Sequence, residues 1–397
     1  MLLFHKFAFP LSGPLNYTHL SVKPLIIVSV TSDLSTDQRV HRTCLVLAEQ
    51  GFEVLLTGRQ LPSSIAVAER PYRTNRFKLW FTTGPMFYAA FNIRLFFYLI
   101  FSKAKYLFAN DLDALPANYL ASRLKRIPLI YDSHEYYTGV PELENRPFVK
   151  ACWKWFERMI FPGLKTIITV NDSIASLYEK EYGKRPMVIR NVPLKGDFQP
   201  TTNKTELRKK LQLPESGKLI ILQGAGINIQ RGAEEAVLTM QFLENTTLLI
   251  VGGGDVLPVL KDLVKEYRLE NKIIFKPRLP YTELMQHTRA ADLGLTLDKD
   301  TNINYRFSLP NKIFDYIHAG IPVLASRLPE VERIIAGYGV GDFIERHDPK
   351  HIAEKMESML QNESALAGWR KNLEIASREL NWDEEKKKFP KIINEQY

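Results

Sequence analysis

Cysteine is scarce in this chain of 397 residues, which contains only Cys44 and Cys152. Neither lies near another cysteine or a histidine pair at the spacing of metal ligands. Zinc-finger sites and a disulfide framework are therefore excluded, and a reducing compartment is the simple inference. We expect the protein to be cytoplasmic.

A long hydrophobic run is also missing. The most hydrophobic region, residues 86–101, is interrupted by Asn92 and Arg94 and is shorter than the ~20 residues that span a bilayer. It is flanked by the basic residues Lys78, Lys103 and Lys105. Two interpretations stay open. One is a partly buried helix, and the other is an aromatic, basic-edged surface that rests peripherally on a membrane.

The N-terminal residues lack the features of a secretory signal. Residues 1–16 are apolar and aromatic but are broken by His5, Lys6, Pro10 and Pro14, and no small-residue cleavage site follows. We expect residues 1–23 to be an extension that precedes the first strand.

The net charge of +9 at pH 7 favours anionic partners, such as nucleotide sugars, lipid phosphates or an anionic membrane face. The chain has no zinc-finger spacing, no aromatic RNA-recognition motif and no long run of Lys and Arg. We therefore expect no nucleic acid partner.

Short apolar runs alternate with helical patterns along the whole chain. Such runs are typical of strands in a sheet covered on both faces, and the alternation indicates parallel pairing. The predicted strands are residues 25–30, 53–57, 106–109, 128–131, 166–170 and 187–189, and then 219–222, 248–251, 273–275, 293–297 and 323–325. A segment rich in Pro, Gly and polar residues, 193–205, predicts a linker between the two series. The fold class is therefore α/β, with two doubly wound, Rossmann-like domains that bind ligands at their strand ends.

The most informative segment is SLPNKIFDYIHAGIPVLAS, residues 308–326. It predicts a polar turn capped by Ser308, a short helix with Pro310 in its first turn, a stop at Gly320 and a buried strand. A helix N-terminus suits a phosphate, and Asp315 lies on the same face as Asn311. Amides for a diphosphate and a carboxylate for ribose hydroxyls would suit a sugar nucleotide. The alternative is an ordinary amphipathic helix with a solvated Asp315.

The LPNKxFxYxxxGxPVxAS pattern in this segment resembles the donor-binding segment of group-1, retaining glycosyltransferases of the GT-B fold. The resemblance extends from about residue 26 to the C-terminus, and it implies two domains that face a cleft. It also implies a pair of glutamates. Asp315 occupies the second position of that pair, whereas Phe307 stands at the first.

The resemblance further implies a pair of basic residues on the donor diphosphate. Arg231 occupies the second position, but the first falls on Gly226, so half of the pair is missing. Lys312 is a candidate substitute, unless it is a solvated helix residue. The predicted donor-binding residues are Gly224, Gly226, Arg231, Ser308, Leu309, Pro310, Asn311, Lys312 and Asp315, where the glycines let the backbone approach a ligand.

The predicted first domain has ionisable residues directly after a strand, in the sequence YDSHEYY of residues 131–137. The resemblance implies that His134 contacts the transferred sugar, while the alternative is a histidine hydrogen-bonded within its loop. We assign Asp33, Asp37, Asp111 and Glu135 to the acceptor side. Asp37 equally suits a helix cap, and Asp113 is predicted to cap a helix and not to bind a metal.

The resemblance implies a retaining glycosyltransferase of hexosyltransferase type that needs no metal and no cofactor. It would move a sugar from a nucleotide-diphosphate sugar to a hydroxyl of a sugar or lipid-linked acceptor in cell-envelope or surface polysaccharide synthesis, at the cytoplasmic face of the membrane. The predicted catalytic residues are His134, Arg231 and Asp315. The alternatives are a nucleotide-sugar epimerase of the same fold and a non-catalytic subunit that binds sugar nucleotides, the latter because of Phe307 and Gly226.

The predicted domains follow from this comparison. An acceptor-side domain would comprise residues 24–196 together with a C-terminal crossover helix, residues 383–397. A donor domain would comprise residues 197–382.

Overall fold

The computed structural model describes residues 23–35, 37–62, 64, 66–195 and 203–394. Residues 1–22 of the predicted N-terminal extension, residues 196–202 of the predicted linker and residues 395–397 of the predicted crossover helix lie outside the described residues.

The first domain is built on a seven-stranded sheet in the order β3-β2-β1-β4-β5-β6-β7, and every strand pair is parallel. The strand order reverses between β1 and β4, which is where doubly wound sheets bind ligands. Its strands are β1 (Leu25–Asp33), β2 (Glu53–Gln60), β3 (Arg73–Lys78), β4 (Tyr106–Asn110), β5 (Leu129–Ser133), β6 (Thr166–Thr169) and β7 (Met187–Val188). Its helices are α1 (Gln38–Glu49), α2 (Gly84–Phe101), α3 (Asp111–Lys125), α4 (Pro147–Ile160) and α5 (Asp172–Tyr182), with short 3₁₀ turns at Tyr137–Gly139, Pro141–Leu143 and Phe161–Gly163.

The second domain has a six-stranded, all-parallel sheet in the order β10-β9-β8-β11-β12-β13, which reverses between β8 and β11. Its strands are β8 (Lys218–Gly224), β9 (Thr246–Gly252), β10 (Ile273–Lys276), β11 (Leu293–Thr296), β12 (Val323–Ser326) and β13 (Gly341–Ile344). Its helices are α6 (Lys204–Lys210), α7 (Ala233–Thr239), α8 (Leu257–Glu266), α9 (Tyr281–Ala290), α10 (Ile303–Arg306), α11 (Asn311–Ala319), α12 (Pro329–Tyr338), α13 (Pro349–Gln361) and α14 (Glu363–Glu379).

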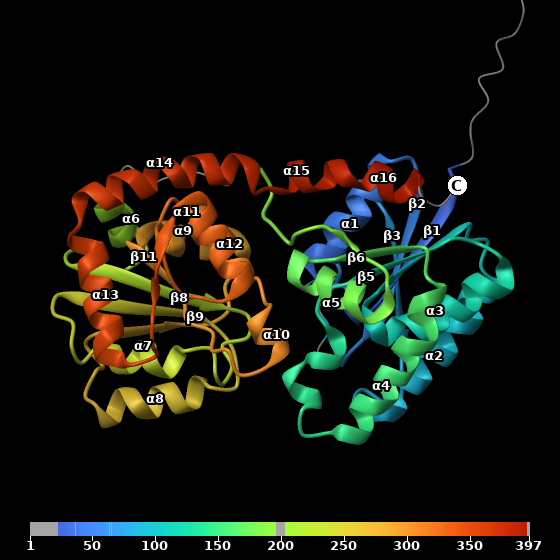
Figure 1. Cartoon of the computed structure of the whole chain (residues 1–397), viewed down its shortest axis with the longest axis horizontal. Coiled ribbons are helices and arrows are strands. Elements are labelled where there is room, and N and C mark those ends of the chain that lie inside the picture. The colour runs from blue at the N-terminus through green and yellow to red at the C-terminus, as the bar shows by residue number, and fades with distance from the viewer. Residues whose placement is uncertain (1–22, 36, 63, 65, 196–202, 395–397) are drawn as a thin grey trace, which may run out of the picture.

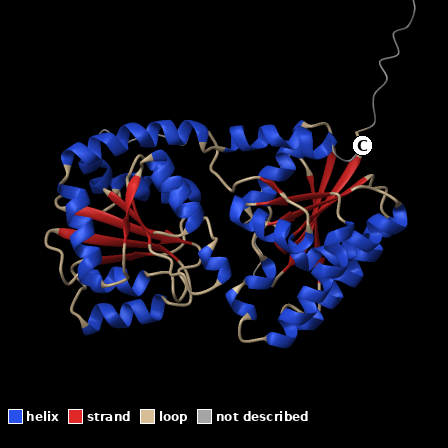
Figure 2. Ribbon diagram, in the orientation of Figure 1, coloured by secondary structure: helices blue, strands red, loops and turns tan. Residues whose placement is uncertain are grey.

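Both sheets are buried on both faces by helices, as Figure 2 shows. In β1 the side chains of Ile26 and Val28 enter one hydrophobic cluster and that of Ile27 enters another, because successive side chains of a strand point to opposite faces. The structure thus confirms the predicted class of two doubly wound α/β sheets.

The C-terminal residues connect the two domains. Helix α14 runs along the second domain, and α15 (Trp382–Glu385), a 3₁₀ turn (Lys386–Lys388) and α16 (Phe389–Asn394) lie beside α1 of the first domain (Figure 1). Trp382 N donates to Pro193 O at 2.7 Å. One hydrophobic cluster contains Val28, Ile221 and Trp382, so the core continues from one sheet to the other.

Three local expectations were wrong. Ser308 does not cap the donor-segment helix, because its hydroxyl donates to Tyr305 O and Pro310 takes the N-cap position. Pro310 therefore precedes the first turn. Asp113 is not an N-cap either, since α3 begins at Asp111 and Asn110 precedes it. The stop at Gly320 is confirmed, with a left-handed φ of 72°.

Candidate active site

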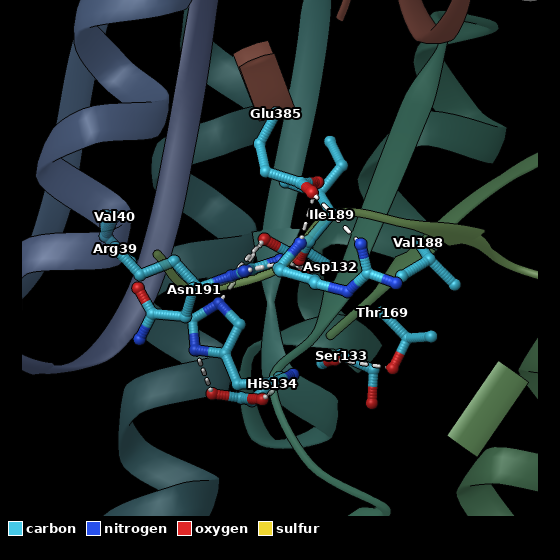
Figure 3. Close-up of polar contacts among 12 residues, drawn as sticks. Arg39, Val40, Asp132, Ser133, His134, Thr169, Val188, Ile189, Asn191 and Glu385 are labelled. Atoms are coloured by element: carbon cyan, nitrogen blue, oxygen red, sulfur yellow. Dashed lines mark hydrogen bonds and ion pairs between the residues drawn. The ribbon is translucent and has the colours of Figure 1, made fainter. Parts of the chain in front are cut away.

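His134 is held between two carboxylates at the carboxyl end of β5. Its Nδ1 lies 3.2 Å from Asp111 Oδ2, and its Nε2 lies 3.4 Å from Asp132 Oδ2. Asp132 is buried and accepts hydrogen bonds from Arg39 Nε and Nη2, at 3.1 and 2.7 Å. Figure 3 shows Arg39 reaching from α1 to Asp132, with the His134 ring beside this pair. Residues of three elements, Arg39 of α1, Asp111 of α3 and Asp132 of β5, therefore hold the imidazole of His134 in place.

These contacts set the charges of the cluster. Burial alone would lower the pKa of His134, but Asp111 and Asp132 outweigh it and raise that pKa to about 9. Burial alone would raise the pKa of Asp132, but Arg39 and His134 hold it well below its usual range. The raised pKa favours the imidazolium form of His134 at neutral pH, with its two N–H groups facing Asp111 and Asp132.

Asp111 is the acceptor-side prediction that the structure brings to His134. Besides the contact with the ring, its Oδ1 accepts a hydrogen bond from His134 N at 2.9 Å. Its backbone has a φ of 59°, in the left-handed region that is uncommon for residues other than glycine. Nearby, Asp113 accepts from Thr31 Oγ1 at 2.5 Å, and burial together with Asp111 raises the pKa of Asp113 to about 7.

The other acceptor-side predictions have different surroundings. Asp33 accepts from Ser35 Oγ at 3.1 Å and lies 3.6 Å from Arg76 Nη1, so it organises its own loop. Asp37 caps α1 by accepting from Val40 N at 3.0 Å. Glu135 is bound from the other domain, since its Oε2 accepts from Asn304 Nδ2 at 2.7 Å.

In the second domain, Asp315 projects from α11 into a set of oriented polar groups. Its Oδ2 accepts from Gln223 Nε2 at 2.9 Å, and its Oδ1 accepts from Tyr281 Oη at 3.2 Å. Gln223 Oε1 accepts in turn from Thr288 Oγ1 at 2.7 Å. Groups from β8 and α9 thus orient this half-buried carboxylate.

Arg231 and Lys312 gather around one buried carboxylate, Asp298, which follows β11. Arg231 Nη1 lies 3.6 Å from Asp298 Oδ1, and Lys312 Nζ lies 3.7 Å from Asp298 Oδ2. Both distances exceed those of normal hydrogen bonds, and Asp298 Oδ1 has no hydrogen-bond donor. The guanidinium of Arg231 also lies 4.9 Å from the centre of the Tyr305 ring.

Burial acts on the pKa values of both cations in this second cluster. It lowers the pKa of Lys312, Asp298 opposes this effect, and Arg231 adds to it. For Arg231, Asp298 and Tyr305 outweigh burial and raise the pKa. The two cations therefore lie close together with one carboxylate between them, an arrangement that can receive further negative charge.

The backbone predicted to bind the donor lies beside these side chains. An added Cβ would have its nearest neighbour at 3.5 Å at Gly224 and at 3.6 Å at Gly226, which leaves room for a ligand. The following glycine turn is packed instead, because a Cβ at Gly252 would lie 1.9 Å from Gly224 O. Ser308, Leu309 and Pro310 lead into α11, and Asn311 is its first residue, so the free amides of its first turn lie here.

The two domains touch next to both clusters. Asn171 Nδ2 donates to Phe307 O at 2.8 Å, and Ser173 N donates to Glu330 Oε1 at 2.7 Å. The partly buried Phe307 packs against the hydrophobic cluster of the first domain. The residue that stands in place of a predicted glutamate is therefore part of the contact between the domains.

Several residues of the site were not predicted. Asp132, Gln223 and Asp298 lie in or just after a strand at its carboxyl end, and this position could have revealed them. Arg39, Arg42 and Tyr281 lie on helices and carry no such signal.

Arg42 interacts electrostatically with residues of both domains. Burial and Arg39 lower its pKa to about 10, while Tyr281 and Asp315 of the second domain oppose this shift.

Within the described ranges, no group of three or more His, Cys, Asp or Glu side chains is arranged to hold a metal ion. The positive charge of the site comes from side chains, among them Arg231, Lys312, Arg39 and Arg42.

Comparisons with known proteins cover most of the chain. The family model "Glycosyl transferases group 1" matches residues 203–375, and the family model "Glycosyltransferase Family 4" matches residues 37–192. A chitobiosyldiphosphodolichol beta-mannosyltransferase of Candida albicans is 24% identical over 224 residues, which are 52% of this chain and 48% of that protein. The chain spans about half the length of the curated relatives it matches.

Solved structures share the whole architecture. Sucrose-phosphate synthase from Thermosynechococcus elongatus is 17% identical, with a TM-score of 0.76 over 94% of this chain and 98% of that chain. Anabaena HepE, solved in complex with UDP-glucose, is 15% identical, with a TM-score of 0.73 over 93% of this chain and 99% of that chain. The predicted GT-B fold is confirmed, and so is the resemblance to group-1 glycosyltransferases, since glycosyltransferase family models match residues 37–192 and 203–375.

Proposed function

We propose that this protein is a retaining glycosyltransferase that moves a hexose from a nucleotide-diphosphate sugar to a hydroxyl acceptor. The observation that carries the proposal is the pair of cations, the partly buried Arg231 and the buried Lys312, on either side of the buried carboxylate of Asp298. A departing nucleoside diphosphate needs such fixed positive charge, which is most effective where water is excluded. Asp315 would accept hydrogen bonds from the ribose hydroxyls.

The pair of cations also accounts for Gly226. Lys312 supplies the second positive charge from α11, although it lies elsewhere in the sequence than the basic residue that the resemblance places at Gly226. With two side-chain cations on the diphosphate, transfer requires no metal, so we expect chelators to leave activity unchanged. HepE, which was solved with UDP-glucose and has the same fold, supports a nucleotide sugar as donor.

His134 would position the sugar from the first domain. Because Asp111 and Asp132 keep it protonated, it would place a positive charge beside the sugar and could not take the acceptor proton. The leaving diphosphate would take that proton on the same face of the sugar. This division of roles favours retention of anomeric configuration over inversion, which requires a base on the opposite face.

The acceptor would be a sugar or a lipid-linked sugar in the synthesis of cell-envelope or surface polysaccharides. One relative is a chitobiosyldiphosphodolichol mannosyltransferase, and one structural neighbour, WaaG, is involved in lipopolysaccharide biosynthesis. Both support this class of acceptor. Reaction at the cytoplasmic face of the membrane agrees with the free cysteines Cys44 and Cys152.

The test separates donor binding from transfer. A panel of UDP-, GDP- and dTDP-sugars is first screened by thermal shift, and the best donor is then incubated with envelope glycolipids. We expect His134→Ala to keep donor affinity within about threefold and to lower the transfer rate about 100-fold. NMR of the product should show the anomeric configuration of the donor. An inverted product would refute the retaining mechanism, conversion of donor without acceptor would indicate an epimerase, and binding without turnover would indicate a binding subunit.

A further inference from the structure

Helix α2 is apolar on the side that faces away from the protein. Phe87, Phe91, Leu95 and Leu99 are buried against the first domain. On the opposite side, the apolar side chains at the surface are Met86, Ile93, Phe97 and Phe101, and the last of these is 82% exposed. A helix that is apolar all round belongs in an apolar environment on both sides, yet α2 lies at the surface.

Helix α4 presents a second apolar stripe. Phe148, Trp155 and Met159 recur at helical spacing and are all exposed, Phe148 to 80%. Trp153, on the other side of this helix, is buried. Trp80, in the loop before α2, is 100% exposed. Exposed aromatic side chains at this density mark an interaction surface.

The two helices are neighbours. The rings of Tyr88 in α2 and Trp153 in α4 meet edge to face, with their centres 5.2 Å apart. Figure 1 shows α2 and α4 together on the first domain, on the side away from the C-terminal helices. We call the exposed apolar residues of α2 and α4, together with Trp80, the aromatic surface.

The charged side chains that α2 and α4 expose are all basic. The exposed charged residues of α2 and α4 are Arg94, Lys150 and Arg158. The single acidic residue of these two helices, Glu157, is buried and lies 2.7 Å from Lys154. Lys78, Lys103 and Lys105 at the ends of the α2 segment are also exposed. The exposed acidic residue Glu144 precedes α4, but the side chains that α2 and α4 themselves expose are apolar or basic. Apolar side chains next to basic ones complement an anionic lipid surface, because lipid tails receive the apolar side chains and lipid phosphates pair with the basic ones.

The sequence predicted a region too short to span a bilayer, but α2 has 18 residues with a mean hydropathy of 1.3, of which 22% are buried, so by length and composition alone it could span one. Its contacts indicate a different arrangement. Asn92 Nδ2 donates to Asp113 O at 2.7 Å, and Asn92 Oδ1 accepts from Ala117 N at 3.1 Å, so α2 is fixed along α3. It can therefore lie in the interface plane and expose only one side to lipid.

We propose that the aromatic surface binds the headgroup and upper acyl region of an anionic bilayer. This proposal goes beyond glycosyl transfer and does not depend on it. A consequence for the active site follows from α3, which is bonded to α2 through Asn92 and whose first turn carries Asp111. A bilayer bound to the aromatic surface would be fixed relative to His134, so an acceptor could be presented from the lipid.

The test uses the full chain and vesicles in a flotation assay. Vesicles of phosphatidylglycerol and phosphatidylcholine are compared with vesicles of phosphatidylcholine alone, at low and high salt. We expect binding to the anionic vesicles, weakened by salt. The variant F97S/F101S/F148S/W155S should bind about tenfold less. A matched control, F242S/V259S, removes exposed apolar residues of the second domain and should bind like the wild type.

Two results would overturn the proposal: no binding of the wild-type chain to anionic vesicles, or equal binding by the aromatic-surface variant. If the wild type does not bind vesicles but forms a dimer that this variant converts to a monomer, the occupant is a second copy of the chain. A cooperative urea unfolding transition like that of the wild type shows that each variant is folded. Failure of vesicle binding would leave the proposed transfer reaction intact. Failure of the transfer reaction would likewise leave the proposed vesicle binding intact.

Discussion

At the scale of single residues, the site consists of two ion clusters of different character. His134, Asp111, Asp132 and Arg39 form a tightly bonded cluster with short contacts. Arg231, Lys312 and Asp298 are loosely paired, at 3.6 and 3.7 Å. A tight cluster holds a side chain in place, whereas a loose one can rearrange around an incoming anion.

The first cluster predicts a loss of stability at alkaline pH. A group whose pKa is raised on folding, here from 6.5 to about 9 for His134, stabilises the protein fully below its unfolded pKa. This contribution, at most roughly 3 kcal/mol, is lost as pH rises through about 9. Urea unfolding at pH 7 and pH 10 should show a larger loss for the wild type than for His134→Gln. Parallel pH profiles of the two proteins would contradict the assignment.

The second cluster predicts an unusual response to ligand. Asp298→Asn should destabilise the free protein by about 1–3 kcal/mol, because the partly buried Arg231 and the buried Lys312 lose their counter-charge. A nucleoside diphosphate would replace that charge, so UDP should raise the melting temperature of the variant more than that of the wild type. Differential scanning fluorimetry with and without UDP measures this difference. An equal or smaller shift would show that the two cations do not bind the diphosphate.

At the scale of elements, apolar runs predicted most of the fold because parallel strands buried on both faces are continuously hydrophobic. Two edge strands, β3 and β13, were not predicted, because they lack such a continuous apolar run. The sequence of β3 is RTNRFK with only Phe77 buried, and that of β13 is GDFI. Edge strands face solvent and need no apolar run. Helix α4 was not predicted either, although its basic residues Lys150, Lys154 and Arg158 recur at helical spacing and could have revealed it.

The helix stop at Gly320 supports a prediction with an internal control. Its φ of 72° disfavours any residue with a Cβ, so Gly320→Ala should lower the free energy of unfolding by about 1 kcal/mol. Gly337 lies inside α12 with nothing within 4 Å of an added Cβ, so Gly337→Ala should be neutral or stabilising by up to about 1 kcal/mol. Urea titration of both variants tests this difference, and the opposite order would refute the left-handed stop.

At the scale of the whole molecule, the C-terminal residues connect the second domain to the first. Glu385 Oε2 accepts from Arg190 N at 3.0 Å and from Lys388 Nζ at 2.5 Å, and this carboxylate is buried. Glu385→Ala should therefore cost about 2 kcal/mol of unfolding free energy. Its neighbour Glu384 pairs at the surface with Lys387, so Glu384→Ala should cost less than about 0.5 kcal/mol. Equal costs would mean that the crossing helices contribute little to stability.

The site could be predicted only in part, because its contacts join distant segments. Strand ends indicated His134 and Asp111, and the donor segment indicated Asp315 and Lys312. The buried pair of Arg39 and Asp132 depends on the packing of α1 against β5, which periodicity does not reveal. The contact of Phe307 with the first domain likewise appears only when both domains are in place.

The central claim is that the second domain binds a nucleotide-diphosphate sugar through Asp315, Arg231 and Lys312. Isothermal titration calorimetry tests it most directly, with the nucleotide sugar that gives the largest thermal shift. Asp315→Ala should bind at least about 30-fold more weakly, because a carboxylate loses its hydrogen bonds to ribose. Asp262→Ala, on the exposed side of α8, should bind like the wild type. Unchanged affinity of Asp315→Ala would contradict the account.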